Sequence, residues 1–355
     1  MRTSPDIPTQ QPAADTPQRP DDALAARRLV LGRLSCAAVH AAVVLGIPAA
    51  LRDDPAAAPE LAARLGADLA ALGRLLDALV ALGVVDRGSG DRYGLTGVGR
   101  SLLADAPGTA APTALLAGGE IGRAWDGLAH AVRTGTSAFV ANTGTDVFGY
   151  LATDPATQAT FYRSQAADLE LNLDRLDRVD FARYPTIVDV GGGDGALLAH
   201  LLERHPAGRG VLLDAPNAAA AAGERFSAAG LGARTIVVAG DFFAAVPPGG
   251  DLYLLRDVLH DWSDDRCRDL LGVCRRDMPS TATLLVIDRV ARRGVGDDLL
   301  IHLMDLYMLS VLGGGRERTA AELDELLTSA GFRIRDRYEL GNATAVEATA
   351  AGRDG

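Results

Sequence analysis

Cysteine is scarce in this chain, and so are the features that mark membrane or nucleic-acid-binding proteins. The three cysteines among 355 residues, Cys36, Cys267 and Cys274, form no metal-ligand or disulfide spacing. No run of about 18 apolar residues is free of charges and turn formers, so we expect no membrane span. Acidic residues outnumber basic ones, 46 to 35, and the formal net charge of −11 argues against nucleic acid or an anionic membrane as the main partner.

The start of the chain also lacks the apolar stretch that a secretory signal needs. Residues 1–20 are rich in Pro, Thr, Asp and Gln, and we expect a disordered tail there and a cytoplasmic protein. The remaining length, with 48% hydrophobic residues overall, can form two cores. We divide it into a winged-helix domain at 21–110, a helical linker at 111–183 and an α/β domain at 184–355.

The winged helix is predicted from local patterns. Residues 23–52 form an apolar, Ala-rich helical region, residues 61–82 repeat apolar side chains at helical spacing, and residues 83–96 indicate a hairpin with a Gly-rich turn. The best-known use of such a fold is DNA binding, so a transcriptional regulator is one alternative. The acidic balance, and the few basic residues beyond Arg64 and Arg74, make this alternative the weaker one.

The most informative motif is VDVGGGDG at 188–195, which lies between a β-type run and a helix-type run at 196–204. Gly191 and Gly193 allow a tight turn and a close approach of the backbone to a ligand, which a Cβ would block. Asp189, just before the glycines, can meet a cationic group. This arrangement suits a nucleoside cofactor at the carboxyl edge of a parallel sheet, although a glycine-rich turn alone is weak evidence.

The next two predicted strands also end in residues suited to a nucleoside. Residues 210–213 run into Asp214, whose carboxylate can accept hydrogen bonds from both ribose hydroxyls. Residues 235–238 run into Asp241 and Phe242, an acceptor and an aromatic ring that suit an adenine amino group and its face. A ribose-binding carboxylate does not by itself separate a nicotinamide cofactor from S-adenosylmethionine (SAM). The position of Asp189 favours SAM, because SAM has a cationic amino-acid end and no pyrophosphate to place on a helix N-terminus.

Taken together, the motifs resemble those of the SAM-dependent O-methyltransferases of the plant caffeate and flavonoid type and their bacterial natural-product relatives. The matching segments follow in order over residues 25–350: VDVGGGDG (188–195), LLDAP (212–216), GDFF (240–243), LRDVLHDWSDD (255–265), GGGRERT (313–319) and AGF (330–332). The resemblance implies methyl transfer from SAM to a hydroxyl of an aromatic or polyketide-like small molecule. It also implies a SAM-binding catalytic domain at 184–355, an acceptor-pocket roof at 111–183, and a homodimer formed through the winged-helix domain.

The resemblance assigns the catalytic roles as well. His260 follows the fourth strand and is expected to be the general base, since histidine is well matched to removing a phenolic proton. Asp288 and Glu317 match the positions of the acidic partners that hold this histidine, although many relatives carry the longer Glu where this chain has Asp288. Arg256 occupies the place of a lysine that faces the cofactor in plant relatives. Asp189, Gly191, Gly193, Asp214, Asp241 and Phe242 complete the expected cofactor set.

The acceptor pocket is expected to draw on apolar and aromatic residues, together with one amide: Trp125, Phe161, Gln165, Trp262, Met304, Tyr307 and Met308. Gln165 departs from many relatives, which have methionine there. An amide at this position predicts hydrogen bonding to a more polar acceptor.

Other reactions on the same fold stay open. Bacterial relatives of this type include N- and C-methyltransferases and enzymes that bind SAM without transferring its methyl group, such as hydroxylases, decarboxylases and pericyclases. His260 with Glu317 favours true transfer. His260, Asp261 and His302 could also be interpreted as a metal site, but their spacing is loose and we expect no metal.

Overall fold

The C-terminal half of the protein is built around a seven-stranded sheet. The structure, a computed structural model, describes residues 20–291, 299–341 and 343–351, so the predicted tail lies outside the described residues except for Pro20. The strand order is β6-β5-β4-β7-β8-β10-β9, and β10 runs antiparallel to the other strands, which are all parallel to one another. The strands are β4 (Thr186–Val190), β5 (Arg209–Asp214), β6 (Thr235–Ala239), β7 (Leu252–Arg256), β8 (Thr283–Arg289), β9 (Phe332–Glu339) and β10 (Ala343–Ala350).

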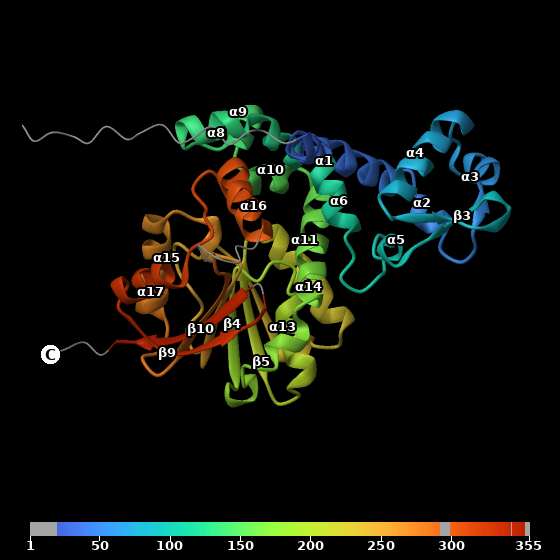
Figure 1. Cartoon of the computed structure of the whole chain (residues 1–355). Helices are drawn as coiled ribbons and strands as arrows, with labels where there is room; N and C mark the ends of the chain where they lie inside the picture. The colour runs from blue at the N-terminus through green and yellow to red at the C-terminus, as the bar shows by residue number, and fades with distance from the viewer. Residues whose placement is uncertain (1–19, 292–298, 342, 352–355) are drawn as a thin grey trace, which may run out of the picture.

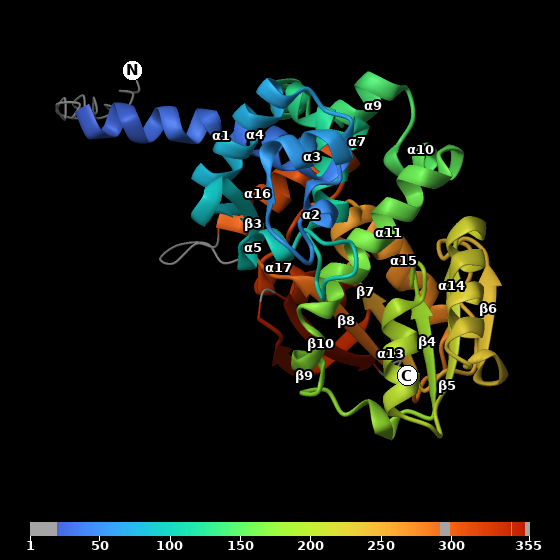
Figure 2. The same cartoon turned by 90° about the vertical axis from the view of Figure 1, so that its right-hand side faces the viewer.

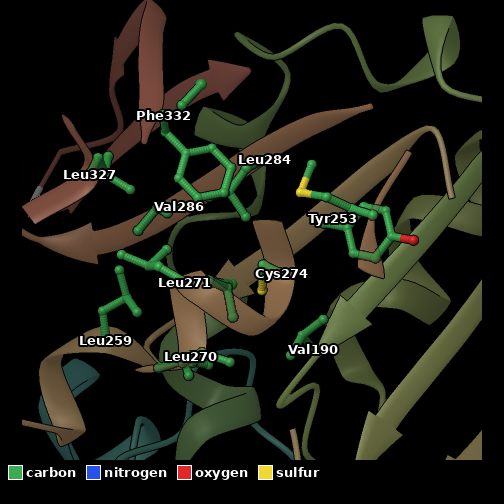
Figure 3. Close-up of a cluster of buried hydrophobic side chains, with 14 of the residues drawn as sticks. Val190, Tyr253, Leu259, Leu270, Leu271, Cys274, Leu284, Val286, Leu327 and Phe332 are labelled. Carbon is green, nitrogen blue, oxygen red and sulfur yellow. The ribbon is translucent and has the colours of Figure 1, made fainter. Parts of the chain in front are cut away.

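Helices cover both faces of this sheet, because successive strand residues alternate between two cores. Tyr253 and Leu255 of β7 point to one core, which includes α15 (Asp264–Asp277) and α17 (Ala320–Ser329). Figure 3 shows part of this core, with Tyr253, Leu270, Leu271 and Leu284 packed together. Leu252 and Leu254 point to the other core, against α13 (Ala196–Arg204) and α14 (Pro216–Ala228). Figure 1 shows the two helical layers on either side of the strands.

The N-terminal part has the predicted winged-helix arrangement. A small sheet of order β1-β3-β2 carries the hairpin, and a separate apolar core containing Leu61, Leu76 and Val85 lies between it and the helices. Helix α1 extends out from the rest of the chain (Figure 2). The elements are α1 (Pro20–Val44), α2 (Ile47–Ala50), β1 (Ala56–Ala57), α3 (Ala58–Leu65), α4 (Leu69–Ala81), β2 (Val85–Arg87), a 3₁₀ turn (Ser89–Asp91), β3 (Arg92–Leu95) and α5 (Gly97–Arg100).

A block of short helices connects the two parts and covers the carboxyl edge of the large sheet (Figure 1). It consists of α6 (Ala111–Gly118), α7 (Glu120–Arg123), a 3₁₀ turn (Ala124–Gly127), α8 (Leu128–Thr134), α9 (Ala138–Thr143), α10 (Val147–Thr153), α11 (Pro155–Glu170) and α12 (Leu173–Leu176). Residues 134–149 contain α9 and most of the first turn of α10. Side chains cap both helices: Ser137 accepts from the amide of Val140, and Asp146 accepts from that of Gly149.

Near the C-terminus, α16 (Leu299–Tyr307) continues into a π-helical turn, Met308–Leu312. The hydroxyl of Ser137 donates to the carbonyls of Ser310 and Val311, at 3.1 and 2.8 Å, so the turn is tied to the roof. π turns of this kind are frequent at functional sites. No helix in the described part of the chain is long and apolar enough to span a membrane.

Candidate active site

The glycine loop after β4 is shaped by close contacts. Gly191 and Gly193 have φ values of +72° and +59°, which favour glycine. A Cβ at Gly192 would lie 2.6 Å from Oδ2 of Asp189 and 2.8 Å from a methyl carbon of Leu212, so the backbone passes directly over these side chains. The loop therefore has no room for a larger residue at this point.

Asp214 lies beside this loop because β5 pairs in parallel with β4. Its Oδ2 accepts a 2.8 Å hydrogen bond from the Gly193 amide, and its Oδ1 accepts a 2.6 Å bond from the Ala215 amide. Burial raises the pKa of Asp214, and these two amides oppose the rise. The carboxylate is thus held in one orientation next to the loop, as a ribose-binding group should be.

Asp189 is a buried carboxyl with an unused oxygen. Asp189 is 1% exposed, and its Oδ2 makes no hydrogen bond within the described part of the chain. Burial, together with the charge of Asp214, raises the pKa of Asp189 to about 7, against the opposing effect of Arg256. A buried carboxylate oxygen that has no hydrogen-bond partner among the described residues suits a ligand that brings a positive charge, and the amino group of SAM would supply one.

The segment that follows β6 contributes mainly aromatic side chains to the site. Phe242 lies near Gly191 and packs edge-to-face against Trp262, with ring centroids 6.2 Å apart. Trp262 also stacks on Phe148 of α10, at 5.9 Å and 20°, so this cluster links the sheet edge to the roof. Asp241 is exposed, and its Oδ1 accepts from the amide of Phe243 at 2.8 Å. Its predicted contact with adenine stays a prediction.

His260 lies in a 3₁₀ turn, Leu259–Asp261, just past the end of β7. It is 3% exposed. Its Nδ1 is 3.3 Å from both carboxylate oxygens of Glu317, and its Nε2 is 3.4 Å from Oδ1 of Asp261. The amide of Arg316 donates to the carbonyl of His260 at 2.8 Å, which docks the GGGRERT loop onto this turn. The predicted pairing of His260 with Glu317 therefore has a direct geometric basis.

The charge around His260 is strongly negative. Burial by itself would lower the pKa of His260, but the facing carboxylates, Asp261 first and Glu317 next, raise it to about 10. The histidine is consequently protonated at neutral pH in the absence of ligand. A base of this kind becomes active only when its proton is lost, which has consequences for the pH dependence of the reaction.

Asp288, at the end of β8, lies close to His260 without a hydrogen bond between them in the described structure. It is 4% exposed, and its Oδ1 has no hydrogen-bond partner among the described residues. Burial raises the pKa of Asp288 to about 6, against the effect of His260. Asp257, His260 and Asp288 each place a ligand atom within 4.8 Å of the others. The two oxygens of Asp257 also face arginines, Nη2 of Arg256 at 2.9 Å and Nη1 of Arg289 at 3.8 Å.

Arg256, which was expected against the cofactor, is engaged in ion pairs. Its Nη2 lies 2.9 Å from Asp257 and 3.5 Å from Asp168 of α11. It still affects the cofactor side, since its charge lowers the pKa of Asp189. Its contact with SAM stays a prediction.

The structure brings part of the expected acceptor set together. Phe161 and Tyr307 pack on one apolar cluster beneath the roof, and Trp125 lies against Tyr307, with ring centroids 6.4 Å apart. Met308 is 3% exposed at the start of the π turn. Gln165 and Met304 are half-buried. Trp262 packs in the aromatic cluster with Phe148 and Phe242, and its contact with the acceptor stays a prediction.

Two residues near this site were not predicted from the sequence. Tyr162, next to Phe161 on α11, lies 3.8 Å from where a Cβ of Gly193 would be. Burial raises the pKa of Tyr162, and the carboxylates of Asp214 and Asp194 add to the rise. In the sequence, only the position of Tyr162 next to Phe161 pointed to a place near the site. No sequence pattern pointed to Arg289, which follows Asp288.

The sheet topology and the convergence of Asp189, Asp214 and His260 at one edge define a SAM-dependent methyltransferase. The chain belongs to the O-methyltransferase family: the model for the O-methyltransferase domain matches residues 125–333, and the model for the O-methyltransferase dimerisation domain matches residues 28–105. The predicted family, α/β fold, SAM dependence and enzyme class are thereby confirmed.

Relatives support this assignment over nearly the whole chain. The O-methyltransferase SfmM3 of Streptomyces lavendulae is 44% identical over 314 residues, covering 87% of this chain and 94% of that protein. The O-demethylpuromycin-O-methyltransferase of Streptomyces alboniger is 41% identical over 310 residues, covering 86% and 82%. A solved O-methyltransferase from neocarzinostatin biosynthesis, in complex with SAM and 2-hydroxy-5-methyl naphthoic acid, is 36% identical with a TM-score of 0.77, covering 89% of this chain and 95% of that one.

Proposed function

We propose that this enzyme methylates a hydroxyl group of an aromatic or polyketide-like small molecule, with His260 as the general base. The observation that carries the proposal is the position of His260, buried between Glu317 and Asp261 at the sheet edge where Asp189 and Asp214 converge. Two relatives support the same acceptor class by name: one is an O-demethylpuromycin-O-methyltransferase, and the other was solved in complex with 2-hydroxy-5-methyl naphthoic acid.

The residues present fit the cofactor. Asp189 would face its cationic amino group, Asp214 its ribose hydroxyls, and Phe242 the adenine ring. SAM, when bound, supplies a methyl group made electrophilic by a sulfonium. The protein's task is then to position an acceptor oxygen and to remove its proton.

Each side chain has a distinct role in that task. Nε2 of neutral His260 accepts the proton of the acceptor hydroxyl, and Glu317 at Nδ1 fixes the ring and stabilises the imidazolium that forms. Asp288 adds negative charge near His260. Phe161, Trp125, Tyr307 and Met308 would exclude water and hold an aromatic ring. Gln165 and Met304 are proposed to complete this wall, with the Gln165 amide bonding a polar substituent.

We also propose that two chains associate through the dimerisation domain. Leu29, Val30 and Leu34 of α1 are 82%, 77% and 64% exposed, which is unusual for apolar side chains on one helix. A second copy of the same domain would cover them.

The reaction is tested by incubating the purified enzyme with SAM and a panel of phenolic aromatic acids and hydroxyquinones. We expect one acceptor to gain one methylene unit by mass, with stoichiometric S-adenosylhomocysteine, and NMR should place the new methyl on oxygen. A methyl on nitrogen or carbon, or an altered product without a new methyl group, would contradict the proposal. S-adenosylhomocysteine released without an acceptor serves as the blank.

A further inference from the structure

A buried group of ion pairs lies behind the catalytic histidine, and Arg289 is at its centre. Arg289 is 8% exposed. Its Nη2 donates a 3.0 Å hydrogen bond to Oδ2 of Asp168, and its Nη1 lies 3.8 Å from Oδ1 of Asp257 and 4.0 Å from Oε1 of Glu317. One guanidinium thus faces three carboxylates from three different parts of the chain.

The fold explains why these groups meet. β7 and β8 are adjacent and parallel, so the residues after Arg256 lie next to the end of β8. The amide of Asp257 donates to the carbonyl of Ile287 at 2.9 Å, and Asp257 has φ +51°, an uncommon conformation for a residue with a side chain. Such a conformation persists only where the surroundings enforce it, and here two arginines hold the Asp257 carboxylate.

Arg289 also reaches the helix that forms the acceptor wall. Asp168 belongs to α11 (Pro155–Glu170) and accepts from Arg289 with the same oxygen that lies 3.5 Å from Arg256. Phe161, Gln165 and Asp168 are spaced i, i+4 and i+7, so they lie along one face of this helix. A shift of α11 that moves Phe161 and Gln165 would therefore move Asp168 as well.

On the other side, the same guanidinium reaches the carboxylate that holds the base. Oε1 of Glu317 lies between Nδ1 of His260, at 3.3 Å, and Nη1 of Arg289, at 4.0 Å. The Glu317 side chain is fully buried. Its position relative to His260 therefore depends on the cation behind it, because an uncompensated buried carboxylate is costly.

We propose that Arg289 is a positioning residue that links the acceptor-wall helix α11, through Asp168, to the Glu317 carboxylate that orients His260. This proposal rests on the proposed role of His260 as the base. Arg289 does not touch the reacting atoms; it acts through Glu317 on one side and through Asp168 on the other.

The test is a double-mutant cycle with Arg289→Met, Glu317→Gln and the variant that combines them. We expect Arg289→Met to lower kcat by about tenfold, a typical coupling for buried neighbours, while the SAM dissociation constant stays within about twofold. In the Glu317→Gln background the same change should lower kcat by less than about twofold, since the partner is already neutral. Arg289→Lys should recover most of the lost kcat. Arg183→Met, which removes a distant ion pair with Glu347, is the matched control and should leave kcat unchanged.

Equal losses of kcat in both Glu317 backgrounds would overturn the proposal, and so would a lysine variant no better than methionine. If His260→Ala retains wild-type turnover, the proposed base has failed. The coupling between Arg289 and Glu317 in kcat remains measurable in that case, so the two failures are distinguishable.

Arg289→Met leaves buried carboxylates and could fail to fold, so Asp168→Asn provides an independent test. The Asp168 side chain is 32% exposed, which makes this change mild. We expect a raised KM for the acceptor and about a threefold loss of kcat, with an unfolding midpoint close to wild type. Asp177→Asn, which removes an exposed pair with Arg204, is the control and should change neither. A folded Asp168→Asn enzyme with wild-type kcat and acceptor KM would remove α11 from the link.

Discussion

Gly193 and Asp214 are joined by a 2.8 Å hydrogen bond from the Gly193 amide to the Asp214 carboxylate. This bond connects the loop after β4 to the tip of β5, so the group proposed to bind ribose also fixes the loop beneath the cofactor. Binding and loop geometry depend on the same side chain.

Replacing Asp214 with alanine should therefore weaken SAM binding at least about tenfold, because hydrogen bonds to a charged group contribute roughly 1.5–3 kcal/mol each. Isothermal titration with SAM and with S-adenosylhomocysteine measures the change. Asp251→Ala is a matched control, since Asp251 also accepts from a backbone amide, that of Thr186 at 2.8 Å, but at the opposite edge of the sheet. Unchanged affinity in the Asp214 variant would remove this residue from the site.

Replacing the Asp189 carboxylate should have opposite effects on the stability of the folded protein and on its affinity for SAM. Its pKa in the folded protein, about 7, is above its ordinary value of 3.8, so its contribution to stability is fully present below about pH 4 and is lost as pH rises through 7. Asp189→Asn has no such titration. Without SAM it should unfold at a higher temperature than wild type at pH 8, with the difference shrinking toward pH 4. The same variant should bind SAM more weakly, because an amide cannot neutralise the amino group. A variant less stable than wild type at pH 8 would contradict the assignment.

The tight contact under the glycine loop gives a steric prediction. In Gly192→Ala the new Cβ would meet Asp189 and Leu212 within 2.8 Å, so we expect a destabilised protein with poor SAM affinity. Gly272→Ala is the control: it lies within α15, where a Cβ meets nothing within 4 Å, and should stabilise the helix by roughly 0.5–1 kcal/mol. Thermal unfolding of both variants, with and without SAM, separates the two effects. Equal behaviour of the two alanines would mean that the loop adapts.

The strand tips could be predicted from the sequence because each depends on local patterns. A β-type run followed by Asp189 or Asp214 identifies the sheet edge, and the parallel topology then brings the tips together. The helices of the acceptor-pocket roof were harder to predict from the sequence. Residues 134–149 have weak apolar periodicity, and the helices there begin at the side-chain caps Ser137 and Asp146.

The ion pairs of Arg289 could not be predicted in this way. Asp168 and Arg289 are 121 residues apart, and Glu317 follows 28 residues later. Their contact depends on the adjacency of β7 and β8 and on how α11 crosses the sheet edge, and neither is encoded in a local pattern. Arg256 was assigned by resemblance to the cofactor side, and its pairing with Asp257 and Asp168 came only from the structure.

The exposed apolar face of α1 predicts the oligomeric state. We expect a dimer by size-exclusion chromatography with light scattering, and a monomer or aggregate when Leu29 and Leu34 are both changed to glutamate. Deleting residues 1–19 should leave the dimer intact, whereas deleting residues 1–50 should give insoluble protein. Ile236→Glu, a change at a residue 63% exposed on β6, is the control and should stay dimeric. A monodisperse wild-type monomer at micromolar concentration would contradict the proposed dimer.

The pH dependence of turnover, compared between wild type and His260→Ala, should test whether His260 is the base. Because the pKa of His260 in the free enzyme is raised to about 10, the neutral form that accepts a proton increases as pH rises toward that value. We therefore expect kcat/KM to increase with pH up to about 10. The profile of kcat should rise at lower pH, since a bound sulfonium cation near His260 lowers its pKa in the complex.

His260→Ala should lower turnover by roughly 10²–10⁴ at neutral pH, the usual share of general acid–base catalysis, with little change in SAM affinity. The loss should shrink at high pH, where a phenolic acceptor with a pKa of about 10 ionises without help. Glu317→Gln removes one of the charges that hold the His260 proton, so the rising limb of its kcat/KM profile should move to lower pH. Its effect should not add to that of His260→Ala, because the two side chains act as one unit. Wild-type turnover in the alanine variant, together with a flat pH profile, would show that His260 only positions the acceptor and that proximity to the sulfonium accounts for catalysis.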